Sequence, residues 1–340
     1  MSGKRFNVAI AGATGAVGEV FLSILAERKF PVKNIRLLAS ERSVGKRLKF
    51  AGEEFPVELL SKDAFKGIDI ALFSAGASRS KEFAGPAWES GAVVVDNSSA
   101  FRMEPDVPLV VPEINPQDIA QYKKRGIVAN PNCTTIISIM PLKPLHDYGT
   151  LTRVIASSYQ ATSGAGAKAM AELIAQTKAY AKGEPLEVSA FKHQIAFNVI
   201  PHIDVFLENG YTKEEMKMTN EGRKILGIPG LPVTCTCVRV PVLTAHSISI
   251  NAQFEKKITV AKAKELIAKF PGCQVMDDPA NNVYPMPLLC AGKDDCYVGR
   301  IREDESAENC LNLWVSGDQL RKGAALNAVQ IAEVLAKKYL

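Results

Sequence analysis

The stretch Gly12-Ala-Thr-Gly15-Ala-Val-Gly18 lies between an apolar run, Phe6 to Ala11, and an amphipathic stretch, residues 16 to 29. The apolar residues of that stretch are three and four positions apart, which places them on one face of a helix. Glycines in a strand-to-helix turn allow close approach to a pyrophosphate, and the helix N-terminus adds amide donors. An ordinary strand–helix connection also contains glycines, but this position favours a dinucleotide site. The residues expected to contact the cofactor are Gly12, Thr14, Gly15, Ala16 and Val17.

The first 130 residues repeat this alternation of apolar runs and amphipathic stretches. Apolar strands separated by helices are typical of a parallel sheet that is covered on both faces. The predicted strands are Phe6 to Ala11, Ile35 to Ala39, Ile70 to Ser74, Ala92 to Asp96 and Ile127 to Ala129. We therefore expect an α/β fold that begins with a Rossmann-type dinucleotide-binding domain.

After about residue 150 the pattern changes to alternating apolar and polar residues. This period of two is typical of half-exposed antiparallel strands. The stretches that show it are Thr234 to Val240, His246 to Phe254, Tyr297 to Ile301 and Cys310 to Val315. Thr259 is expected to cap a helix. The last twenty residues form another helical pattern and are expected to pack on the first domain. The second half is thus predicted to be a mixed α+β domain.

Length and charge limit the classes of function. A chain of 340 residues exceeds one ordinary core and predicts about two domains. Its 41 Lys and Arg against 36 Asp and Glu give a formal charge of +5, spread along the sequence. The apolar runs are far shorter than the ~20 residues of a membrane helix. No basic stretch followed by an apolar core opens the sequence, so we expect no secretory signal. We expect no nucleic-acid or membrane partner.

The seven cysteines have irregular spacing, and their number is odd. This pattern predicts neither a disulfide framework nor a zinc site, so no metal is expected. It favours a reducing compartment, the cytoplasm, with most thiols buried.

Cys133 is the exception. Asn130-Pro-Asn-Cys133-Thr-Thr135 follows the predicted strand at 127–129 and precedes another apolar run. Pro131 and Asn132 favour a turn into a helix, with Cys133 in its first turn. Amides and the helix dipole there favour a thiolate, whereas a buried structural cysteine is the alternative. A thiolate beside a nicotinamide predicts addition to an aldehyde, hydride loss from the thiohemiacetal, and transfer of the thioester to a second nucleophile.

The end of the second predicted strand bears on the choice of nicotinamide cofactor. An acidic residue there would bind the ribose hydroxyls of NAD, whereas Ser40, Arg42 and Ser43 suit a 2′-phosphate. Glu41 in the same segment could instead bind the ribose of NAD, and the segment could also be an ordinary solvated turn. We expect NADP as the cofactor.

Several further segments carry a family resemblance. They are Asn97-Ser-Ser-Ala-Phe-Arg102, Gln160-Ala-Thr-Ser-Gly-Ala-Gly166, Glu214-Glu-Met-Lys217, Arg239-Val-Pro241 with His246, and Gln319-Leu-Arg-Lys-Gly-Ala-Ala325. Together with Gly12 to Gly18 and Asn130 to Thr135, they make the chain resemble the aspartate-β-semialdehyde dehydrogenases over essentially its whole length.

The resemblance implies a fold and a reaction. It implies an NADP-binding domain of residues 1–132 completed by a C-terminal helix at 321–340, and a catalytic and dimerisation domain of residues 133–320. The protein would be a homodimer. It would reduce 4-phospho-L-aspartate to L-aspartate 4-semialdehyde with NADPH, reversibly and with release of phosphate, for lysine, threonine and methionine synthesis.

The resemblance also implies roles for individual residues. Cys133 resembles the nucleophile, His246 the acid/base and Gln160 the residue that orients the thiol-bound intermediate. Arg239 would bind the α-carboxylate and Glu214 the ammonium group of the substrate. The implied phosphate site consists of Arg102, Asn132 and Lys217. The implied nicotinamide-side contacts are Ser163 and Gly164, and Gln319 is an implied cofactor contact.

Other readings stay open. An N-acetyl-glutamyl-phosphate reductase or a glyceraldehyde-phosphate dehydrogenase would share the thiol chemistry. Neither substrate has the free ammonium group that Glu214 suits. In a non-catalytic NADP-sensing protein, Cys133 would be an inert thiol.

Overall fold

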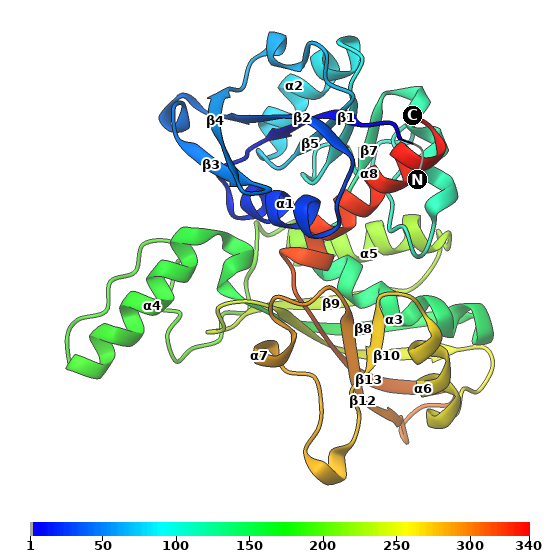
Figure 1. The fold of residues 1–340 in the computed structure, drawn as a ribbon. Helices are drawn as coiled ribbons and strands as arrows, with labels where there is room; N and C mark the ends of the chain where they lie inside the picture. The colour runs from blue at the N-terminus through cyan, green and yellow to red at the C-terminus, as the bar shows by residue number, and fades with distance from the viewer. Residues whose placement is uncertain (1–2) are drawn as a thin grey trace. The chain divides into compact units, whose positions relative to one another are not determined.

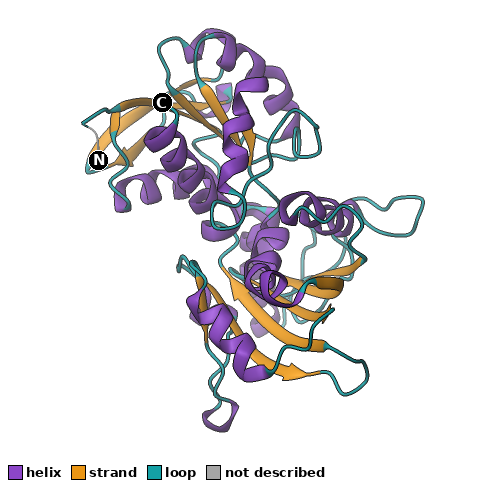
Figure 2. Cartoon of the chain, turned by 90° about the vertical axis from the view of Figure 1, so that its right-hand side faces the viewer, coloured by secondary structure: helices purple, strands orange, loops and turns teal. Residues whose placement is uncertain are grey.

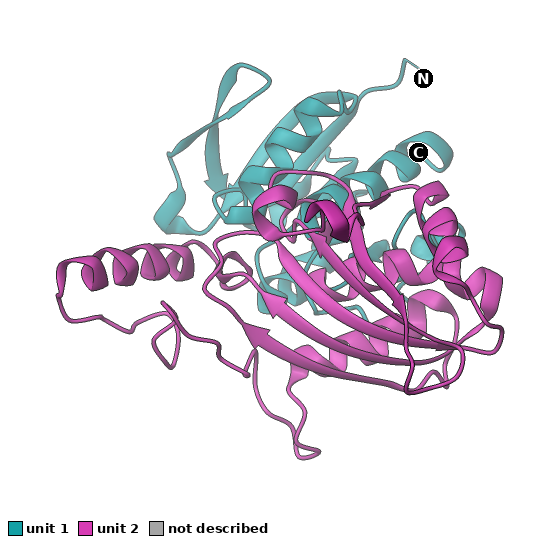
Figure 3. Cartoon of the chain, turned by 90° about the horizontal axis from the view of Figure 1, so that it is seen from below, with its two compact units in different colours: residues 1–132, 324–340 teal, residues 133–323 magenta. Residues whose placement is uncertain are grey.

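The computed structural model describes residues 3–340, which divide into two compact units. Unit 1 comprises residues up to Asn132 together with Ala324–Leu340, and unit 2 comprises Cys133–Gly323 (Figures 1 and 3). The chain therefore leaves unit 1 once, and its last seventeen residues return to it.

The centre of unit 1 is a seven-stranded sheet with the order β3-β4-β2-β1-β5-β6-β7. β3 and β4 are antiparallel, and the other neighbouring pairs are parallel. The strands are β1 (Phe6–Ala11), β2 (Val32–Ala39), β3 (Arg47–Phe50), β4 (Glu53–Leu59), β5 (Ile70–Phe73), β6 (Val93–Asp96) and β7 (Ile127–Ala129).

Helices complete unit 1. They are α1 (Ala16–Glu27), α2 (Ala77–Glu89) and α8 (Leu326–Lys338), with the short helical turns η1 (Glu41–Ser43), η2 (Lys62–Phe65) and η3 (Pro116–Lys124). α8 lies beside α1, and both share one apolar core with the sheet (Figure 1). The rings of Tyr122 in η3 and Tyr339 lie 6.0 Å apart. The C-terminal segment is thus an integral layer of unit 1.

Unit 2 is built on a six-stranded sheet with the order β11-β12-β13-β10-β8-β9. The strands are β8 (Leu151–Gln160), β9 (Val233–Arg239), β10 (His246–Phe254), β11 (Cys273–Val275), β12 (Cys296–Glu303) and β13 (Cys310–Gly317). The central pairs are antiparallel, and the pairs at both ends, β11–β12 and β8–β9, are parallel.

One face of this sheet is covered by helices, as Figure 2 shows. They are α3 (Cys133–Gly149), α5 (Lys213–Leu226) and α6 (Val260–Lys269). Ile248 and Ile250 of β10 point to this face and are essentially inaccessible. The opposite face, called the outer face below, holds Ser249 and Trp314 side by side and Tyr159 with 37% of its surface exposed.

The remaining elements of unit 2 include an arm. It consists of α4 (Ala167–Lys182) and the segment after it, and it extends away from the sheet (Figure 1). The carboxylate of Glu172 accepts the Ser189 amide at 3.0 Å, and Gln176 accepts the Ile195 amide at 3.1 Å, so the segment is tied to the helix. The short elements are η4 (Thr162–Ala165), η5 (Pro279–Asn281), α7 (Pro287–Cys290) and the π-helical turn η6 (Arg321–Ala325).

One expectation from the sequence needs correction, and one hairpin was missed. Thr234 to Val240 alternates as an antiparallel strand would, but the corresponding β9 is parallel to β8. Alternation reports only that one face is buried, and says nothing of strand direction. The hairpin of β3 and β4 was not predicted, because its burial is slight and charged residues interrupt its apolar ones.

The N-terminus of α5 gives a first test. The Thr212 hydroxyl accepts the Glu215 amide at 3.3 Å, and the Glu215 carboxylate accepts the Thr212 amide at 2.7 Å. This reciprocal cap satisfies two backbone donors that a helix start otherwise leaves open. We expect Thr212→Ala to lower the free energy of unfolding by about 1 kcal/mol in urea denaturation. Thr212→Ser keeps the hydroxyl and should unfold as the wild type does; equal loss in both variants would contradict the cap.

Candidate active site

Cys133 is the first residue of α3, as the sequence predicts. It is partly exposed, whereas the other six cysteines are buried. The turn η6 packs directly against it, because a side chain at Gly323 would lie 2.9 Å from the Cys133 Cβ. π-Helical turns are frequent at functional sites. A glycine is therefore required at position 323 for the thiol to hold this place.

The peptide groups of Ala161, directly after β8, hold two further candidate residues. The Ala161 N–H donates to Nδ1 of His246 at 3.1 Å. Its C=O accepts from Nη1 of Arg239 at 2.7 Å. Strand pairing explains the convergence: parallel pairing sets Gln160 opposite Arg239, and β10 begins with His246 on the other side of β8.

The imidazole of His246 is fully buried. Burial and then the positive charge of Arg239 hold the pKa of His246 well below its ordinary value. A Cβ on Gly164 would lie 2.8 Å from Nη1 of Arg239 and 3.1 Å from Nε2 of His246. The glycine at 164 thus allows the backbone to lie directly against the ring and the guanidinium.

Gln160 lies next to charged residues of α5. Its Nε2 donates to Ser158 Oγ at 3.2 Å and to Glu214 Oε1 at 3.3 Å. Glu214 also accepts from Lys217 at 2.9 Å. The negative charge of Glu214 also favours the charged form of Arg239. Glu214 therefore acts on two cations, Lys217 and Arg239.

Lys217 is bound more tightly than the sequence indicated. Its Nζ contacts both Glu214 and Asp204 at 2.9 Å. Burial alone would lower the pKa of Lys217, but Glu214 and Asp204 raise it to about 12. The ammonium is therefore charged, and two carboxylates already neutralise it. Asp204 was missed in the sequence; only its place in the fold, thirteen residues before Lys217, reveals it.

Gln319 makes contacts that differ from a simple cofactor contact. Its Oε1 accepts the Ala245 amide at 2.8 Å, and its Nε2 donates to Ser163 Oγ. Ala245 has φ +72°, a left-handed conformation that costs a non-glycine residue about 1–2 kcal/mol. Gln319 thus fixes the backbone just before His246 and the side chain of Ser163.

In unit 1, Arg102 and Asn132 are buried. Nε of Arg102 donates to the Asn130 carbonyl at 2.9 Å, and Nη2 donates to the Asn97 carbonyl at 3.0 Å. The guanidinium is therefore held against the two segments that follow β6 and β7. The sequence motif predicted a role for Arg102, but not these carbonyl partners.

The turn between β1 and α1 has the geometry of a phosphate cradle. Gly12 has φ +92°, and a Cβ there would lie 2.4 Å from the Ser74 carbonyl oxygen. A Cβ on Gly18 would lie 2.2 Å from the Gly12 oxygen. No side chain caps the start of α1 at Gly15, Ala16 and Val17, so its first amides suit an anion. These residues fit a dinucleotide.

The expected 2′-phosphate residues lie beside that turn. Thr14 Oγ1 and Ser43 Oγ are 3.2 Å apart, so the turn after β1 and η1 after β2 are in contact. Ser40 immediately precedes η1, and Arg42 within it is exposed. The hydroxyls and the guanidinium are thus available on one segment of unit 1.

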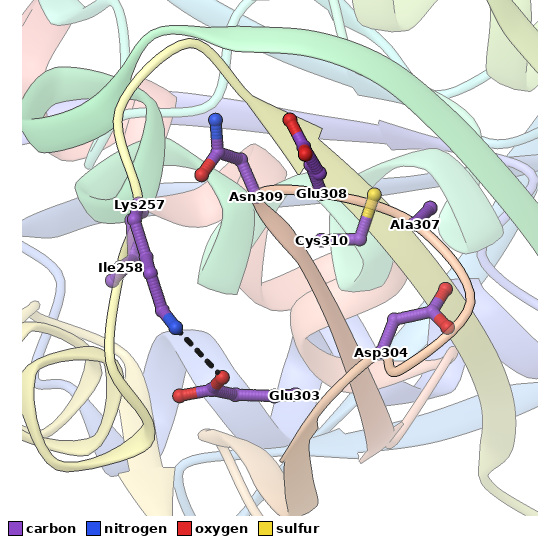
Figure 4. Close-up of a pocket in the computed structure, with 8 residues that line it drawn as sticks. All are labelled: Lys257, Ile258, Glu303, Asp304, Ala307, Glu308, Asn309 and Cys310. Atoms are coloured by element: carbon purple, nitrogen blue, oxygen red, sulfur yellow. Dashed lines mark ion pairs between the residues drawn. The ribbon is translucent and has the colours of Figure 1, made fainter.

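A separate cavity of about 300 Å³ lies in unit 2 near the ends of β10, β12 and β13 (Figure 4). An ion pair between Lys257 and Glu303, 3.1 Å long, spans it. Burial raises the pKa of the Cys310 thiol in its wall, which makes that sulfur a poor nucleophile. This cavity contains none of the candidate residues above.

Two searches of the described chain bear on other functions. Residues 3–340 contain no group of three or more His, Cys, Asp or Glu side chains that would hold a metal ion. Within the same range, no helix has the length and apolar character needed to cross a membrane.

Comparison with known proteins gives consistent matches. The model described as semialdehyde dehydrogenase, NAD binding domain, matches residues 7–122, and that described as semialdehyde dehydrogenase, dimerisation domain, matches residues 142–322. The chain is 55% identical over 337 residues to aspartate-semialdehyde dehydrogenase of Aquifex aeolicus, covering 98% of this chain and 99% of that protein.

Solved structures agree. A crystal structure of aspartate semialdehyde dehydrogenase II from Vibrio cholerae complexed with ASA has a TM-score of 0.97 and 45% identity, covering 99% of this chain and 100% of that chain. The enzyme from Candida albicans with NADP has a TM-score of 0.76 and 25% identity, covering 98% and 99%.

The buried imidazole predicts how stability depends on pH. Because the pKa of His246 is lowered in the folded chain, only the unfolded chain takes up this proton as the pH falls below about 6.5. We expect this residue to cost the wild type up to about 1.4 kcal/mol of unfolding free energy per pH unit as the pH falls below roughly 6.5. Urea unfolding of His246→Gln should lack that component, and His202→Gln should retain it. Identical pH slopes for the wild type and His246→Gln would contradict a neutral buried ring.

Proposed function

The chain belongs to the semialdehyde dehydrogenase family, and we propose that it interconverts 4-phospho-L-aspartate and L-aspartate 4-semialdehyde with NADP(H) and phosphate. The observation that carries the proposal is the convergence of Gln160, Arg239 and His246 on Ala161, in the unit that also presents Cys133 at a helix start.

Cys133 is the proposed nucleophile. In the biosynthetic direction its thiolate attacks the acyl phosphate, the C–O bond to phosphate breaks, and a thioester forms. A nicotinamide cofactor, when bound, would supply the hydride for reduction of the thioester. His246 faces the reacting oxygen, and Gln160, held by Ser158 and Glu214, orients the thiol-bound group. The sulfur then leaves as thiolate and the semialdehyde is released.

The charges of unit 2 suit the two ends of an amino acid. Arg239, fixed by the Ala161 carbonyl, is placed to bind the α-carboxylate in a bidentate manner. Glu214 supplies the negative charge for the ammonium group. This buried carboxylate favours a free ammonium over an N-acetyl group, which separates the proposal from an N-acetyl-glutamyl-phosphate reductase.

The phosphate site is proposed from three residues. They are Arg102, Asn132 and Lys217, as the family resemblance implies. Arg102 carries the main positive charge in this assignment. Lys217 contributes less, because Glu214 and Asp204 compensate it.

We propose NADP rather than NAD as the cofactor. Ser40, Arg42 and Ser43 support a 2′-phosphate site beside the glycine turn. In unit 2, Gly164 packs closely on Arg239 and His246, and Gln319 acts by holding Ser163. Unit 1 is the proposed cofactor-binding domain, and unit 2 the proposed catalytic and dimerisation domain. The cysteine pattern favours a cytoplasmic enzyme of amino-acid biosynthesis.

The decisive experiment is phosphate-dependent reduction of NADP⁺ with L-aspartate 4-semialdehyde, followed by the absorbance of the reduced nicotinamide. Turnover should require phosphate and be faster with NADP⁺ than with NAD⁺. Cys133→Ala should reduce kcat at least a thousandfold, roughly, because no other group supplies the nucleophile. Cys310→Ala, a buried cysteine outside the site, should retain activity. Turnover in Cys133→Ala, or none in the wild type, would contradict the proposal.

We propose a second copy of the chain as the protein partner. The description of the model that matches residues 142–322 supports this choice. Unit 2 exposes large apolar side chains on the outer face, on the arm and in loops, which favours a protein partner. These include Tyr159, Tyr180, Phe197, Val199, Val205, Phe206, Leu243, Met286 and Leu288.

Ser249 lies on the outer face between Ser157 and Trp314, on neighbouring strands. We expect Ser249→Arg to place an unpaired charge in the interface and halve the mass measured by light scattering after size exclusion. Ser306→Arg in an exposed loop is the matched control and should remain dimeric. A dimeric Ser249→Arg would exclude the outer face as the interface.

A further inference from the structure

Three asparagine side chains of unit 1, called the amide chain below, are joined by hydrogen bonds. Asn97 directly follows β6, Asn130 directly follows β7, and Asn327 is the second residue of α8. β6 and β7 are neighbouring parallel strands, so Asn97 and Asn130 meet at the carboxyl ends of the sheet, where open α/β sheets bind ligands. Asn327 is thus the contribution of the C-terminal helix to this edge, and both it and Asn130 are inaccessible to solvent.

The orientation of each amide follows from its partners. Nδ2 of Asn327 donates to the Val110 carbonyl at 2.9 Å and to Oδ1 of Asn130 at 2.7 Å. A carbonyl only accepts, so Asn327 must turn its nitrogen to this side, and Asn130 must present its oxygen. Nδ2 of Asn130 then points the other way and donates to Oδ1 of Asn97 at 2.6 Å. The donors of the amide chain therefore all point in one direction, from α8 to the end of β6.

The amide chain ends on the two backbone segments that hold Arg102. The guanidinium donates through Nε to the Asn130 carbonyl at 2.9 Å and through Nη2 to the Asn97 carbonyl at 3.0 Å. The side-chain amide of Asn130 thus joins the same two residues whose carbonyls orient Arg102. Beyond Asn97, the amide and the hydroxyl of Ser98 donate to the Asp96 carboxylate at 3.0 and 2.8 Å. The segment after β6 is therefore fixed at both of its sides.

We infer that Asn327 is a positioning residue for the phosphate site. Through the amide chain it fixes the direction of the Arg102 guanidinium, so the C-terminal helix takes part in phosphate binding. The inference rests on the proposed function for the role of Arg102, whereas the hold of Asn327 on that side chain does not depend on the reaction.

Burial makes the amide chain sensitive to the loss of one member. Water cannot replace a lost partner of Asn130, and an unpaired buried polar group costs more free energy than a hydrogen bond gains. Hydrogen bonds in series also polarise one another where the dielectric is low. Removing the amide of Asn327 takes away the donor to Oδ1 of Asn130. We expect Asn130 to rearrange, and the carbonyls that hold Arg102 to move with it.

Steady-state kinetics with semialdehyde separate positioning from a purely structural role. We expect Asn327→Ala to raise the KM for phosphate about fivefold or more, the effect of one lost buried hydrogen bond. The KM for NADP⁺ should stay within about twofold of the wild type. Val329→Ala removes a buried apolar side chain from the same helix, so it should lower stability and leave the phosphate KM unchanged. An unchanged phosphate KM in Asn327→Ala, or an equal rise of both KM values, would overturn the inference.

A double-mutant cycle tests whether Asn327 acts through Arg102. Arg102→Lys keeps a positive charge but lacks the planar fork that the two carbonyls hold. In that background, adding Asn327→Ala should leave the phosphate KM essentially as it is in Arg102→Lys alone. The same fold-rise in both backgrounds would show that Asn327 acts by another route, and would contradict the inference.

Chemical modification tests the position of Arg102 without substrate. Phenylglyoxal reacts with guanidinium groups, and Arg102 has only 7% of its surface exposed. In the full-length chain we expect modification at Arg102, measured by peptide mass spectrometry, to be several-fold faster in Asn327→Ala than in the wild type or Val329→Ala. Arg42, which is exposed in unit 1, should react at one rate in all three.

Equal modification of Arg102 in the three chains would overturn the inference, whether or not the semialdehyde is turned over. A wild type without phosphate-dependent turnover would contradict the proposed function alone. If Asn327→Ala does not fold, Asn327→Ser decides, because its shorter hydroxyl can donate to only one of the two acceptors of the amide. We expect a phosphate KM and a modification rate above those of the wild type, and wild-type values of both would refute the positioning role.

Discussion

The site of unit 2 depends on a single peptide unit. Ala161 donates its N–H to His246 and accepts from Arg239 with its C=O, so the imidazole and the guanidinium have fixed positions relative to each other. Both bonds follow from strand order. β8 lies between β10 and β9, and all three strands bring their site residues to the same end of the sheet. The parallel pairing of β8 and β9 is essential, because an antiparallel β9 would carry Arg239 to the opposite end.

Glycines define the space around these fixed groups. Gly164 allows the backbone to pack on the ring and the guanidinium, and Gly323 allows η6 to pack on Cys133. In unit 1, Gly12 and Gly18 allow close packing of the first turn. At each of these four positions a Cβ would lie 2.9 Å or less from a neighbouring atom, which is closer than van der Waals contact. The close packing at both sites thus requires glycine at these positions.

The sequence predicted a large part of this arrangement. The strand β10 was predicted with the bounds that it has, Cys133 was predicted at a helix start, and the family resemblance is confirmed. Motifs also named the residues that converge in unit 2. The direction of β9 and the contacts of Gln319 and Asp204 were not predictable, because they depend on pairing between segments far apart in the chain. Backbone groups such as the Ala161 amide leave no signature in a sequence at all.

The carboxylate of Glu215 joins two elements of unit 2. One oxygen caps α5 at Thr212, and the other accepts the Cys237 amide of β9 at 2.9 Å. Glu215 therefore links the helix that contains Glu214 to the strand that contains Arg239. A shift of α5 along β9 would break these hydrogen bonds. The spacing between the charges of Glu214 and Arg239 is therefore fixed by the backbone. We expect relatives that bind a longer or shorter amino acid to differ in the side chains of the site, while α5 and β9 keep their positions.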